Sequence, residues 1–167
     1  MQGYYNQPEE TAKAIVDGWF YTGDLGKIDS KGNLIITGRK KNVIVLKNGK
    51  NVFPEEIEEM IMKLPYVSEC MMFTREKHNE LVLWCEIVYE PALLEEESIT
   101  REQLAARFAK DLADINDILP KYKHINHFIM SEEPMIKTTT QKVKRRAEVD
   151  KIYKQWDDEK CYNTIMK

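Results

Sequence analysis

Cysteine and long apolar runs are scarce in this sequence, and each scarcity excludes a class of protein. Three cysteines among 167 residues, with no CxxC or Cys/His spacing, argue against a disulfide framework and against a structural zinc site. The longest apolar run, residues 81–89, is interrupted by Glu86 and is far shorter than the roughly 20 residues that span a bilayer. Neither a basic flank nor an apolar stretch follows Met1, so a secretory signal is not expected. We therefore expect a cytoplasmic protein that has no transmembrane segment.

The net charge of −3 argues against a protein that binds nucleic acid over its whole surface, but the charge is unevenly distributed. Residues 39–50 contain five basic and no acidic residues, and residues 136–154 contain seven basic and two acidic residues. The two segments could converge on one polyanion, or each could be a solvated face. A nucleic-acid patch at residues 142–146 is a further alternative, and its binding would weaken steeply with salt.

The N-terminal third of the chain has the pattern of a short helix followed by two β-hairpins. Pro8 is suited to open a helix that Gly18 can end. Residues 28–37 carry a hairpin signal followed by a strand. Residues 43–53 predict a second hairpin around Asn48-Gly49, a dipeptide that favours a type I′ turn.

Residues beyond this point have the pattern of a small sheet flanked by helices, so the sequence predicts an α+β fold. Apolar spacing of i, i+3, i+4, i+7 favours one helix from Pro54 and another between Thr100 and Pro120, where Thr100 and Gln103 form a capping-box pattern. A solvated connection is expected at residues 95–97. Two apolar strands with a short connection are expected to pair antiparallel. The expected strands are 67–74, 81–89 and 124–130, and a terminal helix is expected to place on one face Val149, Ile152, Tyr153 and Trp156.

Three polar positions are candidates for a binding or catalytic site. Asp24 follows a glycine where the chain turns, and its carboxylate could accept two hydrogen bonds from a diol such as ribose, although a turn aspartate often bonds its own backbone instead. Arg39 follows an expected strand and suits a ribose or a phosphate, or is a surface residue. Lys142 ends the polar loop 137–142, where its ammonium could reach a carboxylate or phosphate, or the loop is a mobile surface. The three histidines show no metal spacing, so we interpret them as structural.

Five motifs occur along the chain in the order and spacing of one enzyme family. They are Tyr5-Asn6-Gln7-Pro8-Glu9-Glu10-Thr11, Asp17-Gly18-Trp19-Phe20-Tyr21-Thr22-Gly23-Asp24-Leu25-Gly26, Gly38-Arg39-Lys40-Lys41, Asn48-Gly49-Lys50-Asn51-Val52-Phe53-Pro54-Glu55-Glu56-Ile57-Glu58, and the loop that ends at Lys142. Together they resemble the C-terminal part of the adenylate-forming enzymes, which comprise acyl-CoA synthetases, luciferases and the adenylation domains of peptide synthetases. The fourth motif is most similar to that of fatty-acyl-CoA synthetases.

The resemblance implies a two-step reaction and a role for each candidate residue. A carboxylate attacks the α-phosphate of Mg·ATP to give acyl-AMP and pyrophosphate, and the thiol of CoA then displaces AMP. By resemblance, Asp24 would hold the ribose hydroxyls, and Arg39 would contact the nucleotide. Lys41 would be the hinge between domains, and Lys142 would reach the carboxylate and the α-phosphate. The hairpin that would line the path of the CoA pantetheine includes Lys47, Asn48, Gly49 and Lys50.

Three segments depart from the family pattern. Many relatives have Pro-Lys-Thr-Ser-Ser-Gly-Lys where this chain has Ile136-Lys137-Thr138-Thr139-Thr140-Gln141-Lys142, and the missing glycine bears on the backbone geometry of the loop. Asn51 stands where short-chain acyl-CoA synthetases have a phosphate-contacting arginine, so that contact is not expected. Residues 74–80 lack the usual Gly-Val-Pro-Asp stretch.

We interpret the chain as a C-terminal fragment of an ATP-dependent acyl-CoA synthetase. Residues 1–38 would be the tail of the large N-terminal adenylation domain, and residues 39–167 the mobile lid. The expected partners are that N-terminal domain, a carboxylic acid, ATP with Mg²⁺, and CoA. The phosphate-binding loop and the acyl pocket of relatives are not found in this sequence, so the isolated fragment is expected to be inactive. Two alternatives stay open: an acyl-adenylate ligase that loads a carrier protein, and a free-standing module that binds a nucleotide or a protein without catalysis.

Overall fold

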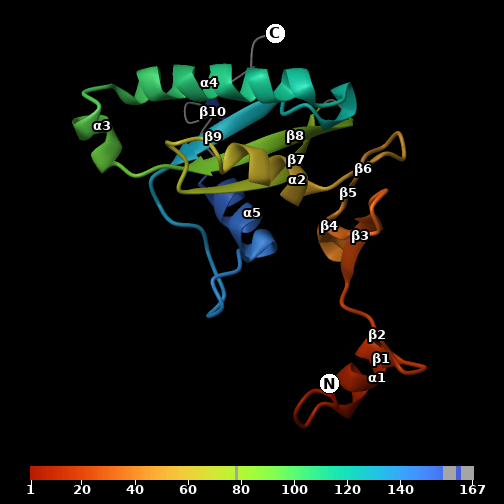
Figure 1. Ribbon diagram of the computed structural model, residues 1–167. Coiled ribbons are helices and arrows are strands. Elements are labelled where there is room, and N and C mark those ends of the chain that lie inside the picture. The colour runs from red at the N-terminus through yellow and green to blue at the C-terminus, as the bar shows by residue number, and fades with distance from the viewer. Residues whose placement is uncertain (78, 156–160, 163–167) are drawn as a thin grey trace. The chain divides into compact units, whose positions relative to one another are not determined.

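The computed structural model describes residues 1–77, 79–155 and 161–162 (Figure 1). Contacts along the chain divide it into two compact units, Met1–Val43 and Ile44–Lys167. Helices combined with small, mostly antiparallel sheets confirm the predicted α+β class. Over the described ranges, no helix is both long enough and apolar enough to cross a bilayer.

The first unit begins with one short helix and a tight hairpin. Helix α1 (Pro8–Ala14) begins where predicted, but the next residue is extended and starts β1 (Ile15–Val16), which pairs antiparallel with β2 (Trp19–Phe20). The linking residues Asp17 and Gly18 have φ angles of 51° and 80°. Positive φ at both central residues is the mark of a type I′ turn. The prediction that the helix continues to Gly18 is therefore wrong, because Asp17-Gly18 forms a hairpin turn.

A second hairpin completes the regular structure of the first unit. Strand β3 (Asp24–Ile28) pairs antiparallel with β4 (Leu34–Arg39), which confirms the predicted hairpin. The Asp29 carboxylate closes the turn, since its Oδ1 accepts the backbone N–H groups of Lys31 and Asn33, both at 2.8 Å. This turn sets a register that places the first residue of β3 opposite the last residue of β4.

The second unit opens with the hairpin of β5 (Ile44–Val45) and β6 (Asn51–Val52). Leu46 donates its N–H to the carbonyl oxygen of Lys50 at 2.9 Å, and Gly49 donates to the carbonyl oxygen of Leu46 at 2.9 Å. Gly49 has a φ of 77°, and Asn48 does not share the positive φ. The loop therefore has three residues and ends in a left-handed glycine, so the predicted two-residue type I′ turn is wrong.

A four-stranded sheet forms the centre of the second unit. Its order is β10-β9-β8-β7. Strands β7 and β8 pair antiparallel as predicted, and β9 lies parallel to β8. The bounds are β7 (Glu69–Lys77), β8 (Glu80–Val88), β9 (His127–Ser131) and β10 (Cys161–Tyr162).

The helices of this unit follow local sequence signals closely. Helix α2 (Pro54–Ile61) begins at its proline, and α4 (Arg101–Ile118) begins at a full capping box, as predicted. Residues 95–97 are exposed between β8 and α4, as predicted, but Glu95 and Glu96 also end a short helix that was not predicted, α3 (Ala92–Glu96), whose leucines pack against the core. Helix α5 (Arg145–Lys154) lies between β9 and β10 in the chain.

Helices cover both faces of the sheet (Figure 1). Helices α2 and α4 pack on one face through a large apolar cluster, and α5 packs on the other through a smaller cluster that includes Trp84 and Ile152. Tyr153 was predicted to share one face of the helix with Val149 and Ile152, but its side chain is exposed, whereas Ile152 is buried. The Tyr153 hydroxyl donates a hydrogen bond to the Thr74 carbonyl oxygen at 3.1 Å. The buried residues of α5 are Glu148 and Ile152, and Trp156 lies outside the described residues.

Glu86, which interrupts the longest apolar run, is buried in β8 on the face that α5 covers. Only 2% of its surface is exposed, and its Oε2 has no hydrogen-bond partner among the described residues. Burial, and next the negative charge of Glu148, raise the pKa of Glu86 to about 8, with smaller contributions from Glu69 and Glu133. Lys151 opposes this shift. The Glu86 carboxyl is therefore largely protonated at neutral pH.

The Glu86 pKa predicts how stability changes with pH. Since this pKa is raised above its ordinary value of 4.5, the folded state holds a proton that the unfolded state releases. The resulting stabilisation is complete below pH 4.5 and is lost as pH rises through 8. We expect the free energy of unfolding to fall between pH 5 and pH 8 by on the order of 3 kcal/mol through this group.

Denaturant unfolding at both pH values checks this expectation. Glu86→Gln, which mimics the protonated carboxyl, should remove most of the decrease, and the exposed Glu90→Gln should leave it unchanged. A decrease of the same size in Glu86→Gln and in the native sequence would contradict the assignment.

Candidate functional site

Asp24 and Arg39 form an ion pair at the open end of the β3–β4 hairpin. The Arg39 Nε lies 2.7 Å from the Asp24 Oδ1, and both side chains stay partly exposed. The strand register makes the two residues direct cross-strand partners. Asp24 is the first residue of a strand, where its N–H donates to the Thr22 Oγ1 at 3.0 Å. Two positions predicted separately are thus brought together as one charged pair.

Lys41 lies in a short 3-10 helix, η1 (Lys40–Asn42), directly after β4. Its side chain is exposed. The division between the two compact units follows Val43, so Lys41 is close to the point where one unit ends and the next begins.

The hairpin predicted to line the CoA path is held by contacts within the second unit. The Lys47 Nζ donates to the Glu76 Oε1 at 2.7 Å and to the Asn79 Oδ1 at 2.8 Å. The Lys50 ammonium lies 4.5 Å from the centre of the Tyr122 ring. Both lysines are therefore placed by specific partners, which gives this hairpin a defined geometry.

Lys142 lies on a tight hairpin that leads into α5. The Thr138 N–H donates to the Lys142 carbonyl oxygen at 2.8 Å, and the Gln141 N–H donates to the Thr138 carbonyl oxygen at 3.0 Å. A third bond runs from the Lys142 N–H to the Thr138 Oγ1 at 3.1 Å. The Lys142 side chain is exposed, and no acidic side chain in the described ranges forms an ion pair with it. The chain thus presents an uncompensated ammonium on an ordered backbone.

Gln141 adopts the left-handed conformation at the position where the family pattern has glycine. Its φ is 60°. The hydrogen bonds around it repeat those around Gly49, where the first and last loop residues are linked in the same way. A left-handed conformation costs a non-glycine residue roughly 1–2 kcal/mol. The substitution therefore keeps the geometry of the loop and adds backbone strain.

The start of α5 is attached to α2 by a bidentate ion pair. The Arg145 Nη1 lies 2.8 Å from the Glu58 Oε1, and the Arg145 Nη2 lies 2.5 Å from the Glu58 Oε2. The same Glu58 carboxylate accepts the Met72 N–H of β7 at 2.6 Å. Burial lowers the pKa of Arg145, but the hydrogen bonds and charge of Glu58 outweigh it and raise that pKa above its ordinary value. Sequence reasoning missed this pair, although Glu58 lies in the fourth motif and Arg145 in a basic segment.

The basic segment 136–154 is partly neutralised by ion pairs. Its Lys137, Arg145 and Lys151 pair with Glu69, Glu58 and Glu148, respectively. These three cations are held within the fold, so the segment does not form one free cationic face. This arrangement favours a local role for Lys142 over a nucleic-acid patch.

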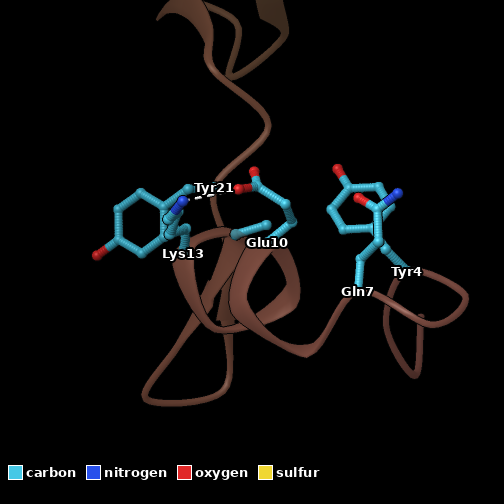
Figure 2. Close-up of a pocket in the computed structure, with 6 residues that line it drawn as sticks. Tyr4, Gln7, Glu10, Lys13 and Tyr21 are labelled. Atoms are coloured by element: carbon cyan, nitrogen blue, oxygen red, sulfur yellow. Dashed lines mark hydrogen bonds and ion pairs between the residues drawn. The ribbon is translucent and has the colours of Figure 1, made fainter.

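The first unit carries a small surface hollow that contains no predicted site residue. Figure 2 shows the Lys13 Nζ paired with the Glu10 Oε1, at 2.7 Å, near Tyr21. The lining residues are Tyr4, Gln7, Glu10, Lys13, Ala14 and Tyr21. The predicted Asp24–Arg39 pair belongs to the first unit, and the Lys142 hairpin belongs to the second.

Residues 41–163 match the AMP-binding enzyme C-terminal domain family. The chain belongs to this family. A long-chain-fatty-acid–CoA ligase of Escherichia coli O6:H1 is 36% identical over 125 residues, which cover 72% of this chain and 22% of that protein. A medium-chain fatty-acid–CoA ligase of Escherichia coli K12 is 30% identical over 146 residues, which cover 87% of this chain and 24% of that protein. The chain thus spans about a quarter of the length of these relatives.

A solved structure has the same fold. The ATP-bound MatB of Rhodopseudomonas palustris superposes with a TM-score of 0.65 at 26% identity, over 93% of this chain and 29% of that one. The family and its relatives confirm the resemblance to adenylate-forming enzymes that the five motifs predict.

The strain at Gln141 predicts a stabilising substitution. Gln141→Gly removes the side chain that disfavours the left-handed backbone conformation. It should raise the free energy of unfolding by about 0.5–1 kcal/mol, after the entropy loss of glycine is included. Thr139→Gly is the matched control, since Thr139 has no positive φ and its replacement should lower stability by roughly the same amount. Urea unfolding measures both. A loss of stability in Gln141→Gly equal to that in Thr139→Gly would show that the loop stores no strain at this position.

Proposed function

We propose that this chain is the C-terminal lid of an ATP-dependent fatty-acyl-CoA ligase, in which Lys142 promotes the formation of acyl-AMP. The observation that supports this most directly is the exposed, uncompensated Lys142 ammonium on a hairpin whose backbone is held by three hydrogen bonds. The names of the relatives favour CoA over a carrier protein as the acceptor. A cytoplasmic location remains a prediction from the sequence.

In the first half-reaction, an oxygen of the fatty acid carboxylate would attack the α-phosphorus of ATP. The new bond joins that oxygen to phosphorus, and the bond from phosphorus to the bridging oxygen breaks, so pyrophosphate leaves with the electron pair. Negative charge builds up on the α-phosphate oxygens. A fixed ammonium at Lys142 would stabilise this charge more in the transition state than in the ground state. Mg²⁺ would arrive with the triphosphate as part of the substrate.

The Asp24–Arg39 pair would bind the nucleotide from the first unit. The Asp24 carboxylate can accept hydrogen bonds from both ribose hydroxyls. Arg39, whose Nε lies 2.7 Å from the Asp24 Oδ1, holds the carboxylate in place. The cross-strand register fixes both backbones, so the diol would meet an acceptor that is already oriented.

In the second half-reaction, the CoA thiolate would attack the acyl carbonyl carbon of acyl-AMP, and AMP would leave as the acyl–oxygen bond breaks. The hairpin that carries Lys47, Asn48, Gly49 and Lys50 would line the path of the pantetheine arm. We place the hinge at Lys41 because this residue lies between β4 and the second unit, where a few dihedral changes can turn a rigid body.

The two half-reactions should respond in opposite ways to two substitutions in the intact enzyme that contains this chain. Lys142→Ala should reduce acyl-AMP formation by about a hundred- to a thousandfold, as for loss of one donor to a developing oxyanion, and should leave thioester formation from supplied acyl-AMP unchanged. Lys41→Pro should impair thioester formation far more than acyl-AMP formation. Proline fixes φ near −65° and restricts the preceding residue, so it would hold the lid in one position. By resemblance to the family, that position is the one used for adenylation. Pyrophosphate release and acyl-CoA formation measure the two steps.

Matched variants complete this experiment. Lys144→Ala removes a neighbouring exposed lysine and should affect neither step, and Lys41→Ala keeps the dihedral freedom and should be mild in both. Equal losses in both steps for Lys142→Ala would make Lys142 structural. Similar behaviour of proline and alanine at position 41 would remove the hinge from the proposal.

A further inference from the structure

Residues 135–137, which we call the root of the Lys142 hairpin, form hydrogen bonds with two acidic side chains. The Glu69 Oε2 accepts the Met135 N–H at 3.2 Å, and the Glu69 Oε1 lies 2.8 Å from the Lys137 Nζ. Between them, the Ile136 N–H donates to the Glu148 Oε2 at 2.5 Å. Glu69 belongs to β7 and Glu148 to α5, so the root is hydrogen-bonded to two different elements.

Glu148 is an unusual residue for its place in α5. It is fully buried, one helical turn before Ile152, on the face that packs against the sheet. An apolar residue there would satisfy the packing, whereas a buried carboxylate is unfavourable unless it has partners. Its partners are the Ile136 N–H and the Lys151 Nζ, the latter at 3.1 Å. One of the two hydrogen-bond partners of this buried side chain therefore belongs to the hairpin.

The root is connected to Lys142 through the hairpin ladder. The Lys144 N–H donates to the Ile136 carbonyl oxygen, and the Thr138 N–H donates to the Lys142 carbonyl oxygen, both at 2.8 Å. An antiparallel bridge joins Lys137 and Val143 between these two bonds. A displacement of Ile136 is thus transmitted directly to the backbone of Lys142.

We propose that Glu148, with Glu69, is a positioning residue that sets where the Lys142 ammonium lies during acyl-AMP formation. This inference rests on the proposed role of Lys142. Catalysis by a fixed charge is sensitive to position, and a misplacement of about 1 Å can reduce a rate about a hundredfold. The carboxylates satisfy backbone donors that the short hairpin cannot satisfy itself, and they fix the hairpin to the sheet and to α5 at the same time.

The test compares two substitutions of Glu148 in the intact enzyme. Glu148→Met keeps the length of the side chain but removes the acceptor, and should reduce kcat of acyl-AMP formation at least about tenfold. KM for ATP and fatty acid, and thioester formation from supplied acyl-AMP, should stay within about twofold, because only the adenylation step uses Lys142. Glu148→Gln retains one acceptor oxygen and should lose less activity. Asp150→Asn, an exposed acidic residue of the same helix, is the matched control.

A double-mutant cycle separates positioning from a general structural role. If Glu148 acts through Lys142, adding Glu148→Met to Lys142→Ala should cause no further loss of acyl-AMP formation. Multiplicative losses, or an equal loss in the two half-reactions, would overturn the positioning role while leaving the role of Lys142 intact. If Lys142→Ala alone has no effect, both the proposed function and this inference fail.

Amide hydrogen exchange of this chain gives a readout that does not depend on activity. Exchange of the Ile136 and Lys144 N–H groups should be at least about tenfold faster in Glu148→Met than in Asp150→Asn. If Glu148→Met does not fold, Glu148→Gln serves in both measurements, and wild-type exchange together with wild-type kcat would overturn the proposal.

Discussion

The bidentate ion pair between Glu58 and Arg145 is the contact on which the arrangement of the second unit depends. It joins α2 and β7 to the first residue of α5, three residues after Lys142. Both side chains are mostly buried, so removal of either partner would leave an uncompensated charge inside the fold. Because α5 follows the Lys142 hairpin closely in the chain, the position of this hairpin within the second unit follows from where the pair holds the helix. This arrangement of charge contributes to the placement of α5 more than to net stability.

The two faces of the central sheet have different physical characters. The face under α2 and α4 is an apolar cluster, which supplies most of the burial that stabilises the unit. The face under α5 combines a smaller apolar cluster with Glu69, Glu86, Glu148 and Lys151. A polar layer of this kind makes the position of α5 dependent on hydrogen bonds and ion pairs, which are directional. Directional contacts therefore define where α5 begins, and with it the backbone from which the exposed Lys142 side chain extends.

Local sequence signals predicted the elements, and contacts between distant residues decided the site. The capping box at Thr100, the proline at the start of α2 and the apolar strands β7 and β8 depend on residues close in sequence, so they could be predicted. The turns at Asp17-Gly18 and Asn48-Gly49 were misassigned because each depends on which flanking residues pair. The Asp24–Arg39 and Glu58–Arg145 pairs need the strand register and the packing of α5, which no local pattern carries. Two buried acidic residues did leave a signal in the sequence. Glu86 is a charge within an apolar run, and Glu148 lies four residues before the core residue Ile152.

The central claim is that the Lys142 ammonium contacts the reacting groups during acyl-AMP formation, and chemical labelling of lysines tests it most directly. The intact enzyme would be treated with an amine-selective reagent, with and without a non-hydrolysable ATP analogue and the fatty acid. Labelling of each lysine would then be read by mass spectrometry. We expect the substrates to protect Lys142 severalfold and to leave Lys144, its exposed neighbour, unprotected. Equal labelling of Lys142 with and without the substrates would contradict the claim.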